Sequence, residues 1–314
     1  MYETLTAEPA AKLQFSKIST SDKPLFEKYL ATQQDRGCEM SFANLYLWGR
    51  QRYTLLHEHI IIFSQFDRRC IYPYPLGNGD KKAVLDAIIA DARERGIVCR
   101  ITGLNSEAKQ TIEQYYPGKF RFHCGRDSFD YVYDINDLAD LAGKKYHKKR
   151  THVNGFLNSY PDYTVQPINA QNVDAVKAFA DEWYKNRLAA DPTADFQLEQ
   201  EALYRAFRHY DELALEGLVL WNGDMILAFT IASQMSADTI DVHFEKGRAD
   251  ANGAYAMINR EFARYIREKH PHIKFLNREE DMGLEGLRKA KQSYYPHHMV
   301  EKCWARLMED SDED

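Results

Sequence analysis

The sequence predicts an α+β protein built from two similar units, each a mixed β-sheet flanked by helices. One order of elements, namely strand, helix, hairpin and then helices alternating with strands, occurs twice along the chain. The chain has 314 residues, of which 44% are hydrophobic and 28% charged, a balance typical of a globular protein with two domains. The halves share this order but not their residues, so a duplicated domain is one interpretation and chance similarity of pattern is the other.

The first half is assigned from apolar spacing and turn residues. Its expected elements are a strand at 13–18, a helix around 26–30, a hairpin at 53–66, a helix at 81–95, a strand at 97–101, a further helix and a closing strand at 129–133. The hairpin is expected to turn near His57 and Glu58, where a polar pair interrupts the alternation.

The second half repeats the order with a clearer hairpin. Its expected elements are a strand at 163–168, a helix at 173–183, a hairpin at 218–232, a strand at 239–244, a helix at 253–269, a strand at 273–276, a further helix and a closing strand at 300–307. Asn222 and Gly223 supply the positive φ angles of a tight turn. Ile240, Val242 and Phe244 alternate and are expected on one face of their strand.

The domain limits follow from these assignments. We expect an N-terminal domain at 1–140, a basic connecting helix at 141–160 and a C-terminal domain at 161–314 that carries the active site.

Charge, cysteines and apolar runs exclude several classes of protein. The net charge of −6 does not predict nucleic-acid binding from bulk electrostatics. Five widely spaced cysteines without a CxxC pair favour free, mostly buried thiols in a reducing compartment. No apolar run approaches the ~18 residues that span a bilayer, and residues 1–5 do not begin a secretory signal. We expect a cytoplasmic protein with no metal site, since its histidine pairs lack further ligands nearby.

Three stretches can carry chemistry. Within 143–152, Lys145, Lys148, Lys149 and His152 fall on one helix face, which can meet phosphates or can be a solvated surface.

Within 277–296, a turn with two glycines leads into a helix that shows Arg288 and Lys291 on one face. These cations can hold a carboxylate, a phosphate or a developing oxyanion, or form ordinary surface ion pairs. Within 243–259, a glycine opens a long helix whose N-terminus can bind an anion.

Four segments resemble the phosphatidylglycerol lysyltransferase C-terminal-domain family, and most closely its free-standing soluble members. These segments are Ser41–Trp48, Leu141–Arg150, Glu245–Asn259 and Asn277–Pro296. The resemblance implies two GNAT-like (acyl-CoA N-acyltransferase) domains in tandem, similar to the Fem-type peptidoglycan aminoacyltransferases. It also implies transfer of an aminoacyl group, usually from aminoacyl-tRNA, to an amine or hydroxyl acceptor that is a small molecule, a lipid or a peptide.

The same resemblance suggests roles for particular residues. Arg288 and Lys291 bind the activated carboxyl end or its phosphates, Asp281 orients the turn or receives a proton, and Glu245 is a second candidate base. The residues expected to bind or steer the substrates are Lys148, Lys149, Arg150, Arg248, Gly253, Tyr255, Asn277 and Tyr294.

Two departures from the family bear on the substrates. The chain lacks a counterpart of the membrane-spanning half of true lysyltransferases, so a lipid acceptor is not the first expectation. Residues 250–255 also fit poorly to the glycine-rich loop that binds acyl-CoA in single-domain GNAT enzymes. The alternatives are a CoA-dependent N-acyltransferase and a non-catalytic GNAT-derived protein that binds RNA or a phosphorylated partner.

Overall fold

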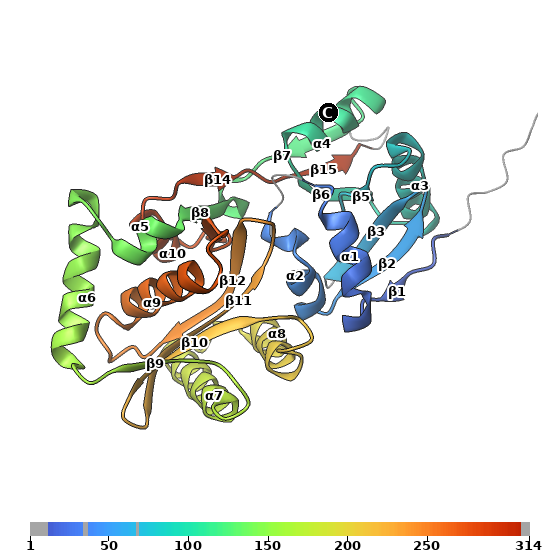
Figure 1. Cartoon of the computed structure of the whole chain (residues 1–314). Helices are drawn as coiled ribbons and strands as arrows, with labels where there is room; N and C mark the ends of the chain where they lie inside the picture. The colour runs from blue at the N-terminus through green and yellow to red at the C-terminus, as the bar shows by residue number, and fades with distance from the viewer. Residues whose placement is uncertain (1–11, 34–36, 67–68, 309–314) are drawn as a thin grey trace, which may run out of the picture. The chain divides into compact units, whose positions relative to one another are not determined.

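The computed structural model describes residues 12–33, 37–66 and 69–308, which form two compact units (Figure 1). The first unit consists of Met1–Ser128 together with Glu301–Asp314, and the second of Phe129–Val300. The N-terminal residues on which we based the absence of a secretory signal lie outside the described ranges.

The first unit has a sheet in the order β1-β2-β3-β4-β6-β15-β7, with β5 beside β3. Its strands are β1 (Ser16–Lys17), β2 (Gln51–Leu56), β3 (His59–Phe66), β4 (Arg69–Pro73), β5 (Leu76–Gly77), β6 (Arg100–Leu104), β7 (Phe120–His123) and β15 (Cys303–Leu307). Its α-helices are α1 (Lys23–Leu30), α2 (Phe42–Leu47), α3 (Lys81–Glu94) and α4 (Ser106–Tyr115). The hairpin turns at His57 and Glu58, both with positive φ, as predicted.

The second unit has a sheet in the order β14-β8-β13-β12-β11-β10-β9. Its strands are β8 (Asp130–Asp134), β9 (Thr164–Pro167), β10 (Glu216–Asn222), β11 (Met225–Gln234), β12 (Thr239–Gly247), β13 (Phe275–Asn277) and β14 (His298–Val300). Its α-helices are α5 (Ile135–Asp140), α6 (His147–Ser159), α7 (Val173–Ala190), α8 (Gln197–Arg208), α9 (Ala254–Lys269) and α10 (Glu285–Gln292). In Figure 1, α6 and α9 lie on one side of this sheet and α7 and α8 on the other.

Apart from β5, the two sheets match in the order and direction of their strands, which supports the predicted duplication. Reading from β1 in one sheet and from β9 in the other, each has four strands joined antiparallel, and the fourth then pairs in parallel with a strand that follows a long helix. The parallel pairs are β4 with β6 and β12 with β13. This architecture confirms the predicted α+β fold with mixed sheets and flanking helices.

The assignment of the closing strands was wrong. We expected 129–133 to close the first sheet and 300–307 the second. Instead β8 pairs with β13 and β14 in the second sheet, whereas β15 pairs with β6 and β7 in the first. Apolar alternation identifies a strand but does not specify a partner far away in sequence, so the pattern could not reveal this exchange.

A β-bulge interrupts the pairing of β11 with β12. Ile231 pairs with Phe244 and the next residue, Ala232, pairs with Val242, so His243 is the extra residue. Ile240 and Val242 pack in the core that includes α9. The bulge shifts the alternation and turns Phe244 away from that face, so the prediction that it shares a face with Ile240 and Val242 was wrong.

The prediction of free cysteines also needs correction. Cys124 and Cys303 form a disulfide with a Cα–Cα distance of 4.2 Å, although they are 179 residues apart in sequence. The pairing of β15 with β7 brings them together, and that pairing was the one the sequence did not reveal. Cys38, Cys70 and Cys99 are not part of a disulfide, and Cys38 and Cys99 are buried. None of the described helices combines the length and the apolar character needed to cross a membrane.

Candidate functional site

In the second unit, several polar side chains lie at the point where the pairing of β12 with β13 ends. The two strands pair only from Thr239–Asp241 to Phe275–Asn277, and β12 then continues to Gly247 beside β11 alone. Because parallel strands direct their carboxyl ends to the same edge, the residues after Asp241 and after Asn277 lie near one another. Arg278 and Glu279 follow Asn277 and contact different residues of β12.

The first group of side chains, called here the Arg278 cluster, consists of Lys149, Glu245, Arg278 and Tyr294. Arg278 Nη2 donates a hydrogen bond of 2.9 Å to Glu245 Oε1. The guanidinium lies 5.1 Å from the centre of the Tyr294 ring, and Lys149 Nζ lies 3.7 Å from the same ring centre. Arg278 Nη1 is buried and has no hydrogen-bond acceptor among the described residues. A buried donor without an acceptor is costly unless a ligand oxygen binds there.

The environment of this cluster changes the pKa of two of its members. Burial, followed by the charge of Arg278, lowers the pKa of Lys149 to about 8, while Glu245 acts in the opposite direction. Burial also raises the pKa of Tyr294 to about 12, which keeps the phenol protonated at neutral pH. A partly buried amine that titrates near neutrality can exchange protons with a substrate.

The predicted cations of the turn and helix are engaged within that turn. Lys291 Nζ donates to the carbonyl oxygens of Arg278, Glu279 and Glu280, at distances of 2.5, 3.1 and 2.5 Å. An ammonium group has three protons, so these carbonyls match its full donor capacity. The contacts fix the backbone that carries Arg278.

The same turn is held by Asp281. Arg288 binds its carboxylate through two hydrogen bonds of 2.8 and 2.9 Å, and the Tyr131 hydroxyl donates a third of 2.6 Å. The bonds from Arg288, the largest influence, hold the pKa of Asp281 well below its usual range. Such a carboxylate stays ionised at neutral pH, which suits an anchor better than a proton acceptor.

The remaining predicted residues lie in several places. Lys148 is exposed, whereas Arg150 donates to the carbonyls of Leu141 and Gly143. Arg248 pairs with Asp250 through its Nε at 3.0 Å and also contacts Glu182.

Three further predicted residues, Gly253, Tyr255 and Asn277, make contacts that shape the backbone near them. Gly253 begins α9 with φ +84°, and a Cβ there would lie 2.3 Å from the carbonyl oxygen of His152. Tyr255 is exposed and its ring lies against Gly247. Asn277 is buried, donates to Asp130 and accepts a 2.7 Å hydrogen bond from the N–H of Glu279.

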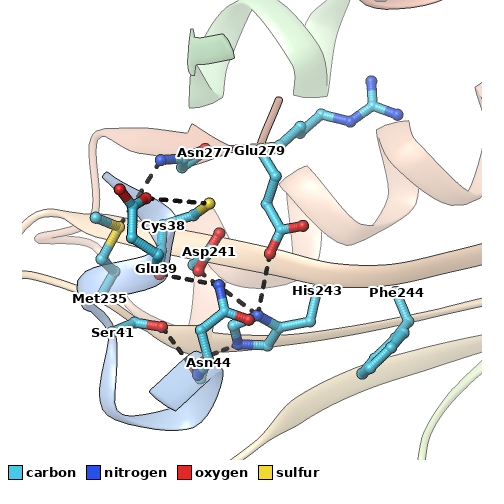
Figure 2. Close-up of polar contacts among 12 residues, drawn as sticks. Cys38, Glu39, Ser41, Asn44, Met235, Asp241, His243, Phe244, Asn277 and Glu279 are labelled. Atoms are coloured by element: carbon cyan, nitrogen blue, oxygen red, sulfur yellow. Dashed lines mark hydrogen bonds and ion pairs between the residues drawn. The ribbon is translucent and has the colours of Figure 1, made fainter. Parts of the chain in front are cut away.

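A second group, called here the His243 cluster, consists of Ser233, Asp241, His243 and Glu279. Figure 2 shows the His243 ring beside the carboxylates of Asp241 and Glu279. Its Nδ1 lies 3.5 Å from Asp241 Oδ2 and 3.5 Å from Glu279 Oε1, and its Nε2 lies 2.8 Å from Ser233 Oγ. An imidazole between two carboxylates can hold a proton or bind a metal ion.

Known proteins relate to nearly the whole chain. Residues 30–306 match the family model described as phosphatidylglycerol lysyltransferase, C-terminal. The chain belongs to this family. A conserved protein of unknown function from Bacteroides thetaiotaomicron has 35% sequence identity and a TM-score of 0.88, over 94% of this chain and 99% of that one.

More distant similarities define the fold of this family member. FemX has a TM-score of 0.59 with 11% identity, over 94% of this chain and 98% of that one. A tandem GNAT protein from the clavulanic acid pathway has a TM-score of 0.50 with 7% identity, over 95% and 99%. The fold is therefore two GNAT-like units in tandem.

A curated relative covers a smaller part of the chain. The protein MYCGA3080 of Mycoplasmoides gallisepticum is 24% identical over 183 residues, which are 58% of this chain and 57% of that protein. The match therefore spans little more than half of that relative.

Sequence reasoning found part of these groups. We predicted Lys149, Glu245 and Tyr294, and the structure brings them together with Arg278, which lies in the Asn277–Pro296 segment and for which we predicted no role. The His243 cluster was missed. The sequence offers no clear signal for it, because Asp241 and His243 alternate regularly with Ile240, Val242 and Phe244 and the bulge appears only in the strand pairing.

Proposed function

We propose that this chain transfers an aminoacyl group from an activated ester, of the aminoacyl-tRNA kind, to an amine or hydroxyl acceptor. The observation that carries the proposal is the buried Nη1 of Arg278, which has no acceptor among the described residues and belongs to a guanidinium fixed by Glu245 and Tyr294. Membership of the lysyltransferase family and the tandem GNAT-like fold support the same class of reaction.

Arg278 stabilises the charge that develops during transfer. As the acceptor nitrogen or oxygen bonds to the ester carbon, the carbonyl oxygen becomes an oxyanion. The Nη1–H of Arg278 donates to this oxygen, and its fixed position means that little reorganisation is needed. Removing one such donor typically lowers turnover by about 10²- to 10³-fold.

Lys149 moves the proton. Its neutral amine takes a proton from the attacking acceptor while the new carbon–nitrogen or carbon–oxygen bond forms. The resulting ammonium returns that proton to the ribose oxygen of the donor as the ester carbon–oxygen bond breaks, so atoms and charges balance. A pKa near 8 suits both steps.

Asp281, Arg288 and Lys291 act as positioning residues. Their contacts hold the backbone on either side of Arg278 and thereby aim its guanidinium. This role replaces the direct binding of a carboxyl or phosphate that we expected for Arg288 and Lys291.

The donor is held partly by charge. Lys148 is exposed on α6 one residue before Lys149, so it can meet phosphates of a polyanionic donor. Arg248 is paired with Asp250 and Glu182, which makes a role in binding the phosphates of acyl-CoA less favourable. We keep the cytoplasm as the predicted location because aminoacyl-tRNA is formed there; the Cys124–Cys303 disulfide removes the support that the cysteines gave to a reducing compartment.

The test presents the purified chain with labelled aminoacyl-tRNAs and labelled acetyl-CoA in parallel, each with a mixture of amine and hydroxyl acceptors. We expect the aminoacyl ester to be consumed faster than its spontaneous hydrolysis, and Arg278→Gln to abolish most of this gain. Arg95→Gln is the matched control, because Arg95 is also a partly buried, acid-paired arginine against an aromatic ring, but in the first unit.

Three other outcomes would contradict the proposal. Consumption of acetyl-CoA alone would identify a CoA-dependent N-acyltransferase. Salt-sensitive binding of RNA without turnover, lost on Lys148→Gln, would identify a binding protein. Equal loss of activity in the Arg278 and Arg95 variants would show that the effect reflects stability and not the reacting group.

A further inference from the structure

We infer that Asp241, His243 and Glu279 form a binding site for one divalent transition-metal ion, with Zn²⁺ the best match. All three belong to the second unit, and none is used in the proposed transfer chemistry. The inference therefore stands or fails separately from the proposed function. It also departs from the expectation of no metal, which considered only histidines that are close in sequence.

The spacing of the donor atoms fits a metal better than hydrogen bonds. His243 Nδ1 lies 3.5 Å from one oxygen of Asp241 and 3.5 Å from one of Glu279, and the donor atoms all lie within 4.8 Å of one another. Hydrogen bonds between nitrogen and oxygen are shorter, at about 2.7–3.2 Å. Ligands about 2.0–2.1 Å from a tetrahedral Zn²⁺ lie about 3.3–3.4 Å apart, which is close to the separations seen here.

The other ring nitrogen of His243 has its own hydrogen-bond partner, which leaves Nδ1 as the ligand atom. Nε2 lies 2.8 Å from Ser233 Oγ, whereas Nδ1 has no hydrogen-bond partner among the described residues. The His243 side chain is only 1% exposed. When Nε2–H donates to Ser233, the lone pair is on Nδ1 and points to the carboxylates. Metal-binding histidines usually have such a second hydrogen bond.

The backbone brings the three ligands together before any ion binds. Ser233 and Asp241 are direct partners across β11 and β12, and the bulge adds His243 beside Asp241. Glu279 has φ +57°, and its N–H donates to the buried Asn277. This conformation lets Arg278 contact Glu245 while the next residue, Glu279, contacts His243.

The donor set indicates the class of metal. One imidazole and two carboxylates suit Zn²⁺ and neighbouring transition metals, whereas Mg²⁺ and Ca²⁺ prefer oxygen ligands. Three protein ligands leave at least one position for water or substrate, as in catalytic zinc sites. Such an ion could activate a bound water or polarise a carbonyl group.

The experiment measures metal binding by the full chain after treatment with a chelator and dialysis. Isothermal titration with ZnCl₂ is expected to show one site per chain, and Zn²⁺ is expected to raise the melting temperature. His243→Gln and Glu279→Gln should each weaken binding at least tenfold, and Ser233→Ala about tenfold through loss of the hydrogen bond to Nε2. His272→Gln, at an exposed histidine of the same unit, should leave binding unchanged.

Two further measurements keep the result interpretable. Circular dichroism of the metal-free variants checks folding, and if His243→Gln fails to fold then Glu279→Gln decides. The spectrum with Co²⁺ should lack an intense thiolate band, because the three ligands contain no sulfur. The inference is overturned by the absence of saturable one-to-one binding, by equal affinity in the cluster variants, or by a thiolate band.

Discussion

Both units contain a buried aspartate that joins an arginine, a tyrosine hydroxyl and a backbone N–H. Asp91 does this in the first unit and Asp281 in the second, and both side chains are 0% exposed. Asp91 accepts hydrogen bonds from Arg95, Tyr72 and the N–H of Leu13. Asp281 accepts them from Arg288, Tyr131 and the N–H of Gly283. A similar polar anchor is therefore used in each half of the duplicated fold.

The units differ at the edge where the parallel pair ends. In the first unit, β4 is five residues long and pairs with β3 in unbroken register. In the second, β12 is nine residues long and has a bulge at His243.

Both units contain a lysine with a pKa of about 8, Lys81 and Lys149. Lys81 donates to the carbonyls of Pro75 and Gly77, whereas Lys149 lies on Tyr294 beside Arg278. A lowered pKa is thus not by itself a sign of function; its surroundings decide.

Replacement of the buried aspartates should give the largest effects. Asp281→Ala removes the partner of Arg288 and of the buried Tyr131 hydroxyl, which should lower the free energy of unfolding of the second unit by about 3–4 kcal/mol. Asp91→Ala should destabilise the first unit by a similar amount. Urea denaturation, followed by hydrogen exchange to separate the units, measures both. Transfer activity under stabilising conditions should fall for Asp281→Ala only. Equal losses of activity in Asp281→Ala and Asp91→Ala would show that the two units do not differ in their role in transfer.

The pH dependence of transfer distinguishes Lys149 of the second unit from Lys81 of the first. Lys149→Met should lower transfer by about 10²- to 10³-fold. In the unmodified chain the rate should rise as the pH passes through about 8, because the neutral amine of Lys149 accepts the proton and forms above its pKa. Lys81→Met should preserve this profile, although the pKa of Lys81 is also about 8. An unchanged profile in Lys149→Met would exclude it as the base.

The disulfide distinguishes the first unit from the second among the described residues. Cys124→Ser should cost the first unit about 2–4 kcal/mol, because the bond joins β15 to the end of β7 and closes a long loop. Thermal unfolding with and without reductant should show the same shift, with little change for the second unit. Identical melting of the oxidised and reduced chains would show that the bond does not contribute to stability.

Gly253 tests the start of α9 with a smaller expected effect. Gly253→Ala should cost about 1–3 kcal/mol, because φ is +84° and the added Cβ would contact the carbonyl of His152. Gly118→Ala, at a positive φ in the first unit with open space around it, should cost less. Thermal melting of both variants compares them, and an equal loss would mean that the contact with His152 has no effect.

The fold was largely predictable because its elements are encoded locally. The hairpin turns at His57–Glu58 and at Asn222–Gly223, and the long helices α3 and α9, all follow from short-range spacing. The exchange of β8 and β15 was not predictable, because strand pairing across more than a hundred residues is decided by packing. The disulfide depends on the same pairing and was missed for the same reason.

The sequence predicted several of the residues that make up the site, but not what each of them does there. Arg288 and Lys291 are cations on one short helix, as the spacing indicated, but sequence could not show that Asp281 and three carbonyls bind them. The role of Arg278 depends on the contact of its guanidinium with the Tyr294 ring and on an Nη1 without an acceptor among the described residues. Both are properties of the packed structure. His243 was hidden because a bulge changes the face on which a residue lies without any clear sequence signal.

The proposed chemistry requires the reacting ester to bind at the edge of β12 in the second unit. Hydrogen exchange with a non-hydrolysable aminoacyl-adenosine amide tests it most directly. We expect protection of 243–247 and 278–281 that is lost in Arg278→Gln, with no change at the matching first-unit strands 69–73 and 100–104. Protection centred on those first-unit strands, or protection that persists in Arg278→Gln, would contradict it.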